Sequence, residues 1–112
     1  MLWRIVYEYS EKDKPVEDFI KSLDGGSISK VTQTIDLLKI HGNLLRMPHS
    51  KKLTRDIFEL RIRGIENIRL LYAFGHDRTI YLLHGFKKKT QKTPPRDIKL
   101  AKRRLKKYLT NI

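Results

Sequence analysis

The sequence predicts an α+β domain whose elements follow the order β-α-α-β-β-β-α. Three observations lead to this prediction: apolar residues recur at helical spacing in the first half of the chain, they alternate with polar residues in the second half, and a basic amphipathic segment follows them. The chain has 112 residues, of which 39% are hydrophobic, and this is enough for one modest core. Residues 1–112 are therefore expected to form a single domain.

The N-terminal half is expected to hold one strand and an αα-hairpin. Residues 2–9 alternate well enough for a strand. Asp13 is placed to cap a first helix, which Gly25-Gly26 would end. Ser27 is placed to cap a second helix, which Gly42 would end, and the short glycine turn between the two helices completes the hairpin.

The second half is expected to form an antiparallel meander followed by a basic helix. Strands are predicted over 58–63, 68–74 and 79–86, joined by short turns, the first of them at 64–67. Thr93-Pro94 suits the cap and the first turn of the last helix. The apolar stripe of that helix consists of Ile98, Ala101, Leu105, Tyr108 and Leu109.

Charge is the strongest functional signal. The chain carries 25 basic and 12 acidic residues, a net charge of +13, and residues 57–112 hold 15 of the basic and 4 of the acidic ones. Such an excess of cations is unfavourable because like charges repel one another, and it is usually retained because an anion binds there. Nucleic acid, an acidic protein and an anionic membrane surface are the partners that fit.

Several classes of protein are excluded. The chain has no cysteine, so disulfides, thiolate metal sites and a catalytic thiol are ruled out. No uncharged apolar run approaches the roughly 20 residues of a membrane span, and the N-terminus lacks the pattern of a secretory signal, so we expect a cytoplasmic protein. The histidines are unpaired and acidic residues are scarce in the basic half, which predicts neither a metal nor a cofactor.

The candidate site is a group of cations on the predicted sheet. Arg61 and Arg63 share one face of a strand, and Arg69 lies on the neighbouring strand. His84 and Phe86 lie near the end of the next strand. Lysines precede and follow the meander, and they complete the group: Lys51, Lys52, Lys87, Lys88 and Lys89. Pairing of the strands would bring these side chains to one cleft.

Such a cleft suits phosphodiester chemistry. Guanidinium and ammonium groups stabilise the negative charge of the transition state, and RNA supplies its own 2′-hydroxyl nucleophile, so cleavage needs no metal. A lysine among cations has its neutral form favoured and can act as a base, and Phe86 can stack a nucleobase. Structural roles also fit: Glu59 and Arg61 as surface residues of a sheet, Phe86 as a core residue, and His84, which alternates with Leu83, as a packed histidine.

Three segments together resemble a known family. They are Phe58-Glu59-Leu60-Arg61 with the preceding Lys52-Leu53, then Ile68-Arg69-Leu70-Leu71-Tyr72, and then the run from His84 to Pro94. Along its whole length the chain is similar to the HigB branch, in its phage-derived subgroup, of the RelE/ParE toxin superfamily. The resemblance implies a RelE-like fold and the toxin of a type II toxin–antitoxin pair, which cleaves translated mRNA on the ribosome as a metal-independent endoribonuclease.

The resemblance implies the function of a metal-independent mRNA interferase. It also implies roles for individual residues. Arg69 would contact the scissile phosphate, Arg61 and Lys88 would be further catalytic cations, and His84 or Lys52 would transfer protons. The substrate-binding residues would be Lys51, Lys52, Arg63, Phe86, Lys87 and Lys89. The implied partners are mRNA, the ribosome and a cognate helix-turn-helix antitoxin of the HigA type, which would form a heteromeric complex with the toxin.

Two alternatives stay open. Some ribonuclease members of the family have a catalytic tyrosine after the last strand. Thr90-Gln91-Lys92 contains none, so His84 or a lysine would have to act as the base if the protein cleaves RNA. The related ParE branch inhibits gyrase rather than cutting RNA, so the superfamily alone does not determine the activity. The alternatives to the ribonuclease are a non-enzymatic growth inhibitor that binds a protein target such as gyrase, and a plain RNA-binding module.

Overall fold

The computed structural model describes residues 1–64 and 66–109. They contain five strands, three α-helices and one short 3-10 helix. In chain order they are β1 (Arg4–Tyr7), α1 (Pro15–Lys21), α2 (Gly25–His41), η1 (Gly42–Leu44), β2 (Ser50–Lys52), β3 (Phe58–Ile62), β4 (Ile68–Phe74), β5 (Thr79–Lys87) and α3 (Pro95–Leu109). The predicted α+β class is confirmed. Ile65, in the predicted turn at 64–67, lies outside the described residues.

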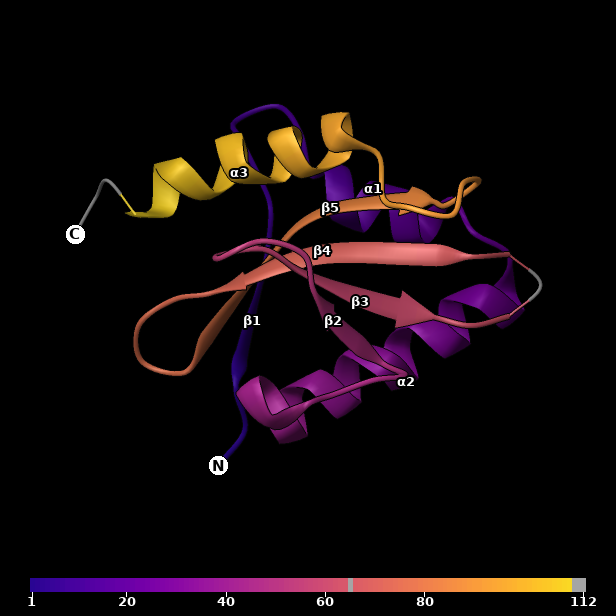
Figure 1. Ribbon diagram of the computed structural model, residues 1–112, viewed down its shortest axis with the longest axis horizontal. Coiled ribbons are helices and arrows are strands. Elements are labelled where there is room, and N and C mark those ends of the chain that lie inside the picture. Colours follow the sequence, from indigo (N-terminus) through magenta and orange to yellow (C-terminus); the bar gives the residue numbers. More distant parts are fainter. Residues whose placement is uncertain (65, 110–112) are drawn as a thin grey trace.

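The strands form the middle of three layers. Helices α1 and α2 pack on one face of the sheet and α3 packs on the other. Figure 1 shows α2 and α3 on opposite sides of the strands. The two N-terminal helices follow each other closely and contact each other, as the predicted αα-hairpin requires.

The sheet is mixed rather than antiparallel. Its strand order is β1-β5-β4-β3-β2, and β2 to β5 form an antiparallel meander. The first strand instead pairs in parallel with β5, with Arg4 opposite Thr79 and Tyr7 opposite Leu82. The prediction of an antiparallel sheet was wrong at this edge, because alternation of hydrophobicity reports which face a strand buries and not the direction of its neighbour.

The order of elements includes one strand that was not predicted. Strand β2 has three residues, none of them apolar, and it pairs with β3 so that Ser50 is opposite Leu60 and Lys52 is opposite Phe58. A strand this short and polar has no alternation to detect. The observed order is therefore β-α-α-β-β-β-β-α, and two of the predicted substrate-binding lysines belong to the added strand.

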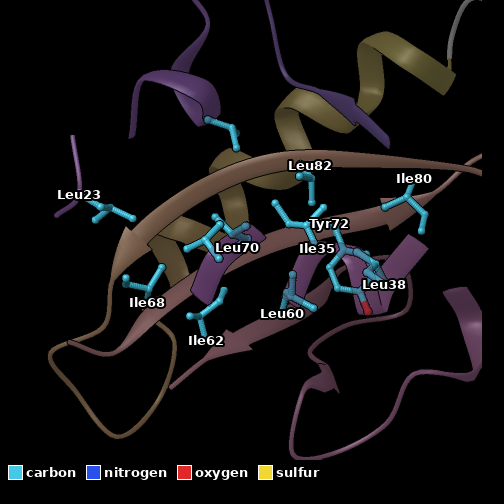
Figure 2. Close-up of a cluster of buried hydrophobic side chains, with 12 residues drawn as sticks. Leu23, Ile35, Leu38, Leu60, Ile62, Ile68, Leu70, Tyr72, Ile80 and Leu82 are labelled. Carbon is cyan, nitrogen blue, oxygen red and sulfur yellow. The ribbon is translucent and has the colours of Figure 1, made fainter. Parts of the chain in front are cut away.

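The main core lies between the sheet and the two N-terminal helices. Leu60, Leu70 and Leu82 come from three neighbouring strands and are buried against Ile35 and Leu38 of α2. Figure 2 shows these side chains converging between the strands and the helix. Burial of each such side chain contributes roughly 1.5–3 kcal/mol, so this face supplies most of the hydrophobic stabilisation.

A smaller core lies under α3. Ala101 and Leu105, from the predicted apolar stripe, are buried against Leu71 and Leu83 of the sheet. Leu109 was predicted to belong to the same stripe, but 44% of its surface is exposed. In the same turn Tyr108 packs on this core and stacks on Tyr81 of β5, so only Leu109 departs from the predicted stripe.

A β-bulge in β5 changes the face on which His84 lies. Leu71 pairs with His84 but Tyr72 pairs with Leu82, so Leu83 is an extra residue on β5. Leu83 packs in the core under α3, and His84 forms a hydrogen bond with the same helix. The expected alternation of these two residues was wrong, because a bulge shifts the pleat without a signal in the hydrophobic pattern.

The helix starts differ from the predicted ones. Oδ1 of Asp24 accepts a hydrogen bond from the backbone N–H of Ser27 at 2.8 Å, so Asp24 rather than Ser27 caps α2. Gly25-Gly26 forms the first turn of α2 instead of ending the first helix. Helix α1 has Lys14 at its N-cap position and no side-chain cap, so Asp13 does not have the predicted capping role.

Candidate functional site

An open cleft lies beside the end of β3, the start of β4 and the segment that follows β5. It encloses about 770 Å³, and none of its lining residues comes from α3. Cations dominate the lining: Arg61, Arg63, Arg69, Lys88 and Lys89. The structure therefore brings together five of the residues that the sequence predicted for the site.

The sheet sets the spacing of two of these arginines. Arg61 of β3 is directly opposite Arg69 of β4, and Phe86 of β5 is opposite Arg69 on its other side. The alternation that sends Leu60 and Leu70 into the main core sends the two arginines to the opposite face. Like charges at opposite positions destabilise a sheet, so this pair requires a compensating negative charge.

Glu59 supplies that negative charge from within the protein. Its side chain is 1% exposed, and Oε1 lies 3.5 Å from Nε of Arg69 and 3.9 Å from Nε of Arg61. The hydroxyl of Thr93 donates a hydrogen bond to Oε2 of Glu59. The interpretation of Glu59 as a surface residue was therefore wrong. Thr93 was predicted to cap the last helix, but that helix begins at Pro95, and the Thr93 hydroxyl bonds Glu59.

Burial and the neighbouring cations lower the pKa values of Arg69 and Lys88. Burial lowers the pKa of the Arg69 guanidinium, and Arg61 and Arg63 lower it further against the opposing effect of Glu59. Burial is also the main cause of the lowered pKa of Lys88, to which Arg69 and Arg61 add while Glu59 opposes them. An arginine keeps its proton in proteins, whereas a lysine with a lowered pKa is more readily neutral and can accept a proton.

Two smaller cavities adjoin the cleft. One, of about 230 Å³, shares Lys88 with the cleft and is also lined by Lys51 and Lys52. The other, of about 240 Å³, shares Arg61 with the cleft and is also lined by Lys30 of α2. The predicted lysines of β2 therefore lie next to the cleft, and the basic surface continues across the β2 edge of the sheet.

Three of the predicted residues, His84, Phe86 and Lys87, line neither the cleft nor the two adjoining cavities. Nε2 of His84 lies 2.7 Å from Oδ1 of Asp97 in α3, and the His84 ring stacks on Phe86 with the ring centroids 5.3 Å apart. Burial lowers the pKa of His84, and the hydrogen bond to Asp97 opposes this effect. Lys87 forms an ion pair with Glu66 at 2.9 Å. These side chains are thus engaged with α3 and with the β3–β4 loop.

Some residues of the site were not singled out from the sequence. Asn67 and Gln91 line the cleft, and Glu59 lies beneath its cations. Glu59 is the only acidic residue of β3, β4 and β5. An isolated acid within a basic sheet is the signal that could have identified it, because a buried carboxylate needs cationic or hydrogen-bonding partners.

Two further kinds of feature are absent from the described ranges 1–64 and 66–109. Within these ranges no group of three His, Asp or Glu side chains gathers that could hold a metal ion. No helix there combines the length and the apolar composition that crossing a membrane demands. The cleft offers guanidinium and ammonium donors, which bind the oxygens of phosphates and carboxylates.

A comparison with protein families identifies the group to which the chain is related. Residues 18–106 match the family described as Phage derived protein Gp49-like (DUF891). This range includes every residue that lines the cleft. A search of curated proteins finds no match. Since the match covers most of the sequence, the chain belongs to the Gp49-like family of phage-derived proteins, a family of RelE/HigB-like toxins.

Proposed function

We propose that this protein is the toxin of a type II toxin–antitoxin pair and that it arrests translation in the cytoplasm by cutting mRNA without a metal ion. The observation that carries this proposal is the convergence of Arg61, Arg69 and Lys88 on one open cleft. Two guanidinium groups at opposite positions of a sheet suit phosphate oxygens, and a lysine with a lowered pKa suits proton transfer. Membership of a family of toxins supports the same function.

The proposed reaction uses the 2′-hydroxyl of the RNA as its nucleophile. The 2′-oxygen forms a bond to the adjacent phosphorus while the bond from phosphorus to the 5′-oxygen of the next nucleotide breaks. The hydroxyl proton passes to a base and the 5′-oxygen takes up a proton, so the products carry a 2′,3′-cyclic phosphate and a 5′-hydroxyl. Arg61 and Arg69 would stabilise the negative charge that develops on the non-bridging oxygens.

Lys88 and Lys52 are the proposed proton-transfer groups. Lys88 lines the cleft, and Lys52 lines the cavity that shares Lys88 with it. His84 was the other candidate from the sequence. Because its ring is bonded to Asp97 and does not line the cleft, we assign His84 to the placement of α3 against β5.

The remaining cations would bind the message on either side of the scissile phosphate. Arg63 and Lys89 line the cleft, and Lys51 lines the adjoining cavity. Lys87 and Phe86 lie at the end of β5 and would contact a flanking nucleotide, Phe86 by stacking on its base. This arrangement suits single-stranded RNA, whose bases can turn toward the protein while the phosphates follow the cations.

The test is to map cleavage in cells. After brief induction of the protein, primer extension on abundant messages should show discrete cuts within translated regions, while DNA stays intact. The same assay with purified protein, on free RNA and on ribosome-bound RNA, tests ribosome dependence. Growth arrest with intact messages would contradict the proposal, and an accumulation of cleaved DNA would instead favour a gyrase inhibitor.

The proposed partner is a small helix-turn-helix antitoxin of the HigA type, encoded beside the toxin gene. Membership of this toxin family implies that the protein pairs with an antitoxin. An acidic or amphipathic segment of such a partner would complement the basic surface of the toxin. Co-expression of the neighbouring gene should restore growth and co-purify its product with the toxin, and failure of both would contradict this assignment.

A further inference from the structure

A single carboxylate joins the parts of the cleft. Oε1 of Glu59 faces Nε of Arg69 and Nε of Arg61, and Oε2 accepts a hydrogen bond from Thr93, in the segment between β5 and α3. Burying a carboxylate is unfavourable unless it is paired and hydrogen-bonded, and Glu59 uses both of its oxygens in this way. The three partners come from β3, β4 and the segment after β5, which are the three parts that border the cleft.

The contacts involve the Nε atoms, and this constrains where the guanidinium groups point. Nε of each arginine is buried and has no hydrogen-bond partner among the described residues, and Oε1 of Glu59 lies within ion-pair distance of both. Nη1 of Arg69 donates to the carbonyl of Ile68 at 3.1 Å, and Nη1 of Arg61 donates to the sulfur of Met47 at 3.5 Å. These contacts leave Nη2 of each guanidinium for an anion, and both side chains line the cleft.

The segment 88–94 is held at both ends. The backbone N–H of Lys88 donates to the carbonyl of Asn67 at 2.7 Å, and the hydroxyl of Thr93 donates to Glu59. Lys88 and Lys89, between these two attachments, line the cleft. The position of Lys88 relative to the arginines therefore depends on the same carboxylate that the arginines contact.

We propose that Glu59 is a positioning residue for RNA cleavage, which aims Arg61 and Arg69 at the phosphate and, through Thr93, holds Lys88 over them. This inference rests on the proposed function, because it concerns how the same cleft acts on a phosphodiester. Glu59 does not touch the RNA. Removing its charge leaves every cation of the cleft in the chain, so RNA binding is retained or strengthened while the geometry that the transition state requires is lost.

The decisive variant is Glu59→Gln, because it keeps the shape of the side chain and removes its charge. Single-turnover cleavage is measured on ribosomes carrying a short message, and binding is measured with an RNA that carries a 2′-deoxy nucleotide at the cut site. We expect the cleavage rate constant to fall by about 10²-fold and the dissociation constant to stay the same or decrease. Each variant is assayed at a temperature at which its melting curve shows it folded.

Glu66→Gln is the matched control. It removes the same charge in the β3–β4 loop beside the cleft, where Glu66 pairs with Lys87 and its side chain is 39% exposed. This variant should cleave at the wild-type rate. If Glu59→Gln does not fold, Thr93→Val tests the same network by removing only the hydroxyl donor, and it should slow cleavage without weakening RNA binding, with Thr93→Ser restoring the rate.

A measurement without RNA separates this inference from the proposed function. Solvent exchange of the arginine Nε–H protons is followed by nuclear magnetic resonance, with the exposed Arg63 as the internal reference. Exchange at Arg61 and Arg69 should be slow in the wild-type protein and should approach the rate of Arg63 in Glu59→Gln. If the wild-type protein cleaves no RNA, the proposed function fails and the exchange rates alone decide whether Glu59 positions the arginines.

Two results would overturn the inference. One is a folded Glu59→Gln protein with unchanged cleavage and unchanged Nε–H exchange. The other is a loss of RNA binding in parallel with cleavage, because that would make Glu59 a residue required for the fold of the cleft as a whole. A fall in the cleavage rate constant with retained binding and faster exchange would establish the positioning role.

Discussion

Arg69 is the residue on which the proposed chemistry depends most, because it is buried, directly opposite Arg61 and in contact with Glu59. Arg69→Ala should lower the cleavage rate by about 10²–10³-fold, the usual cost of removing one preorganised charge donor. Arg69→Lys should also be impaired, since an ammonium group does not replace a planar fork of donors. Growth inhibition and single-turnover cleavage measure both effects. A folded Arg69→Ala protein that keeps its full toxicity would contradict the assignment.

Lys88 gives the cleft a predicted dependence on pH. Burial and the neighbouring arginines lower the pKa of Lys88, so its neutral form becomes populated at a lower pH than that of an ordinary lysine. If the neutral amine accepts the 2′-hydroxyl proton, cleavage should become faster as the pH rises through the lowered pKa and then level off. Lys88→Arg should slow cleavage and remove the rising part of the pH–rate profile. An unchanged profile in Lys88→Arg would exclude Lys88 as the base.

The sequence predicted the cations of the site but not the acid that organises them. Arg61, Arg69 and Lys88 were identified because a basic cleft follows from charge and from the pairing of strands. Glu59 and Thr93 are distant in the chain, and their contact depends on how the segment after β5 crosses the sheet. Hydrophobic periodicity carries no information about such a crossing, so this part of the site required the structure.

At the scale of elements, prediction was accurate where one face of an element is apolar. The meander strands each have such a face, and their predicted ranges lie within one residue of those observed, while α3 begins one residue after the predicted first-turn Pro94. Strand β1 is shorter than predicted at both ends, because the backbone N–H of Trp3 donates to the carbonyl of Lys39 in α2, and the side chain of Glu8 is buried by contacts with α3. Long-range polar contacts of this kind override the alternation from which the strand was extended.

Glu8 anchors α3 to the first strand, and this contact predicts a loss of stability in Glu8→Gln. The carboxylate accepts hydrogen bonds from the Tyr108 hydroxyl at 2.6 Å and from the Lys107 ammonium at 2.9 Å, and Nε of Arg104 lies 3.8 Å away. Hydrogen bonds to charged groups contribute roughly 1.5–3 kcal/mol, so the free energy of unfolding should fall by about this amount. Urea denaturation measures it. The exposed Glu11→Gln is the control, and equal stabilities of the two variants would exclude the anchor.

At the scale of the whole molecule, the two faces of the sheet have different tasks. The face toward α1 and α2 carries the main core, so it supplies stability. The face toward α3 carries a smaller core at one end and the cationic cleft at the other. Much of the net charge of +13 therefore lies on one side of the molecule, in the cleft and on the exposed side of α3. A long-range field of this kind steers an anionic partner before contact.

The association of this toxin with its antitoxin should therefore depend steeply on salt, and α3 is the predicted steering surface. Lys102, Arg103 and Lys106 are exposed on this helix, and none of them lines the cleft. Reversing all three to glutamate should slow association with the antitoxin and flatten its dependence on ionic strength, because rim charges act mainly on the association rate. Stopped-flow mixing at several salt concentrations measures both quantities.

The matched control reverses three other exposed cations, Lys12, Lys14 and Lys21, which lie before and at the end of α1. It changes the net charge of the protein by the same amount, so a general effect of charge would slow both variants equally. A larger effect of the α3 reversal would locate the steering field on that helix. An association rate that falls only in the control would instead indicate that the antitoxin binds near the αα-hairpin, because charges act most strongly within about 10 Å at moderate salt and α1 and α3 pack on opposite faces of the sheet.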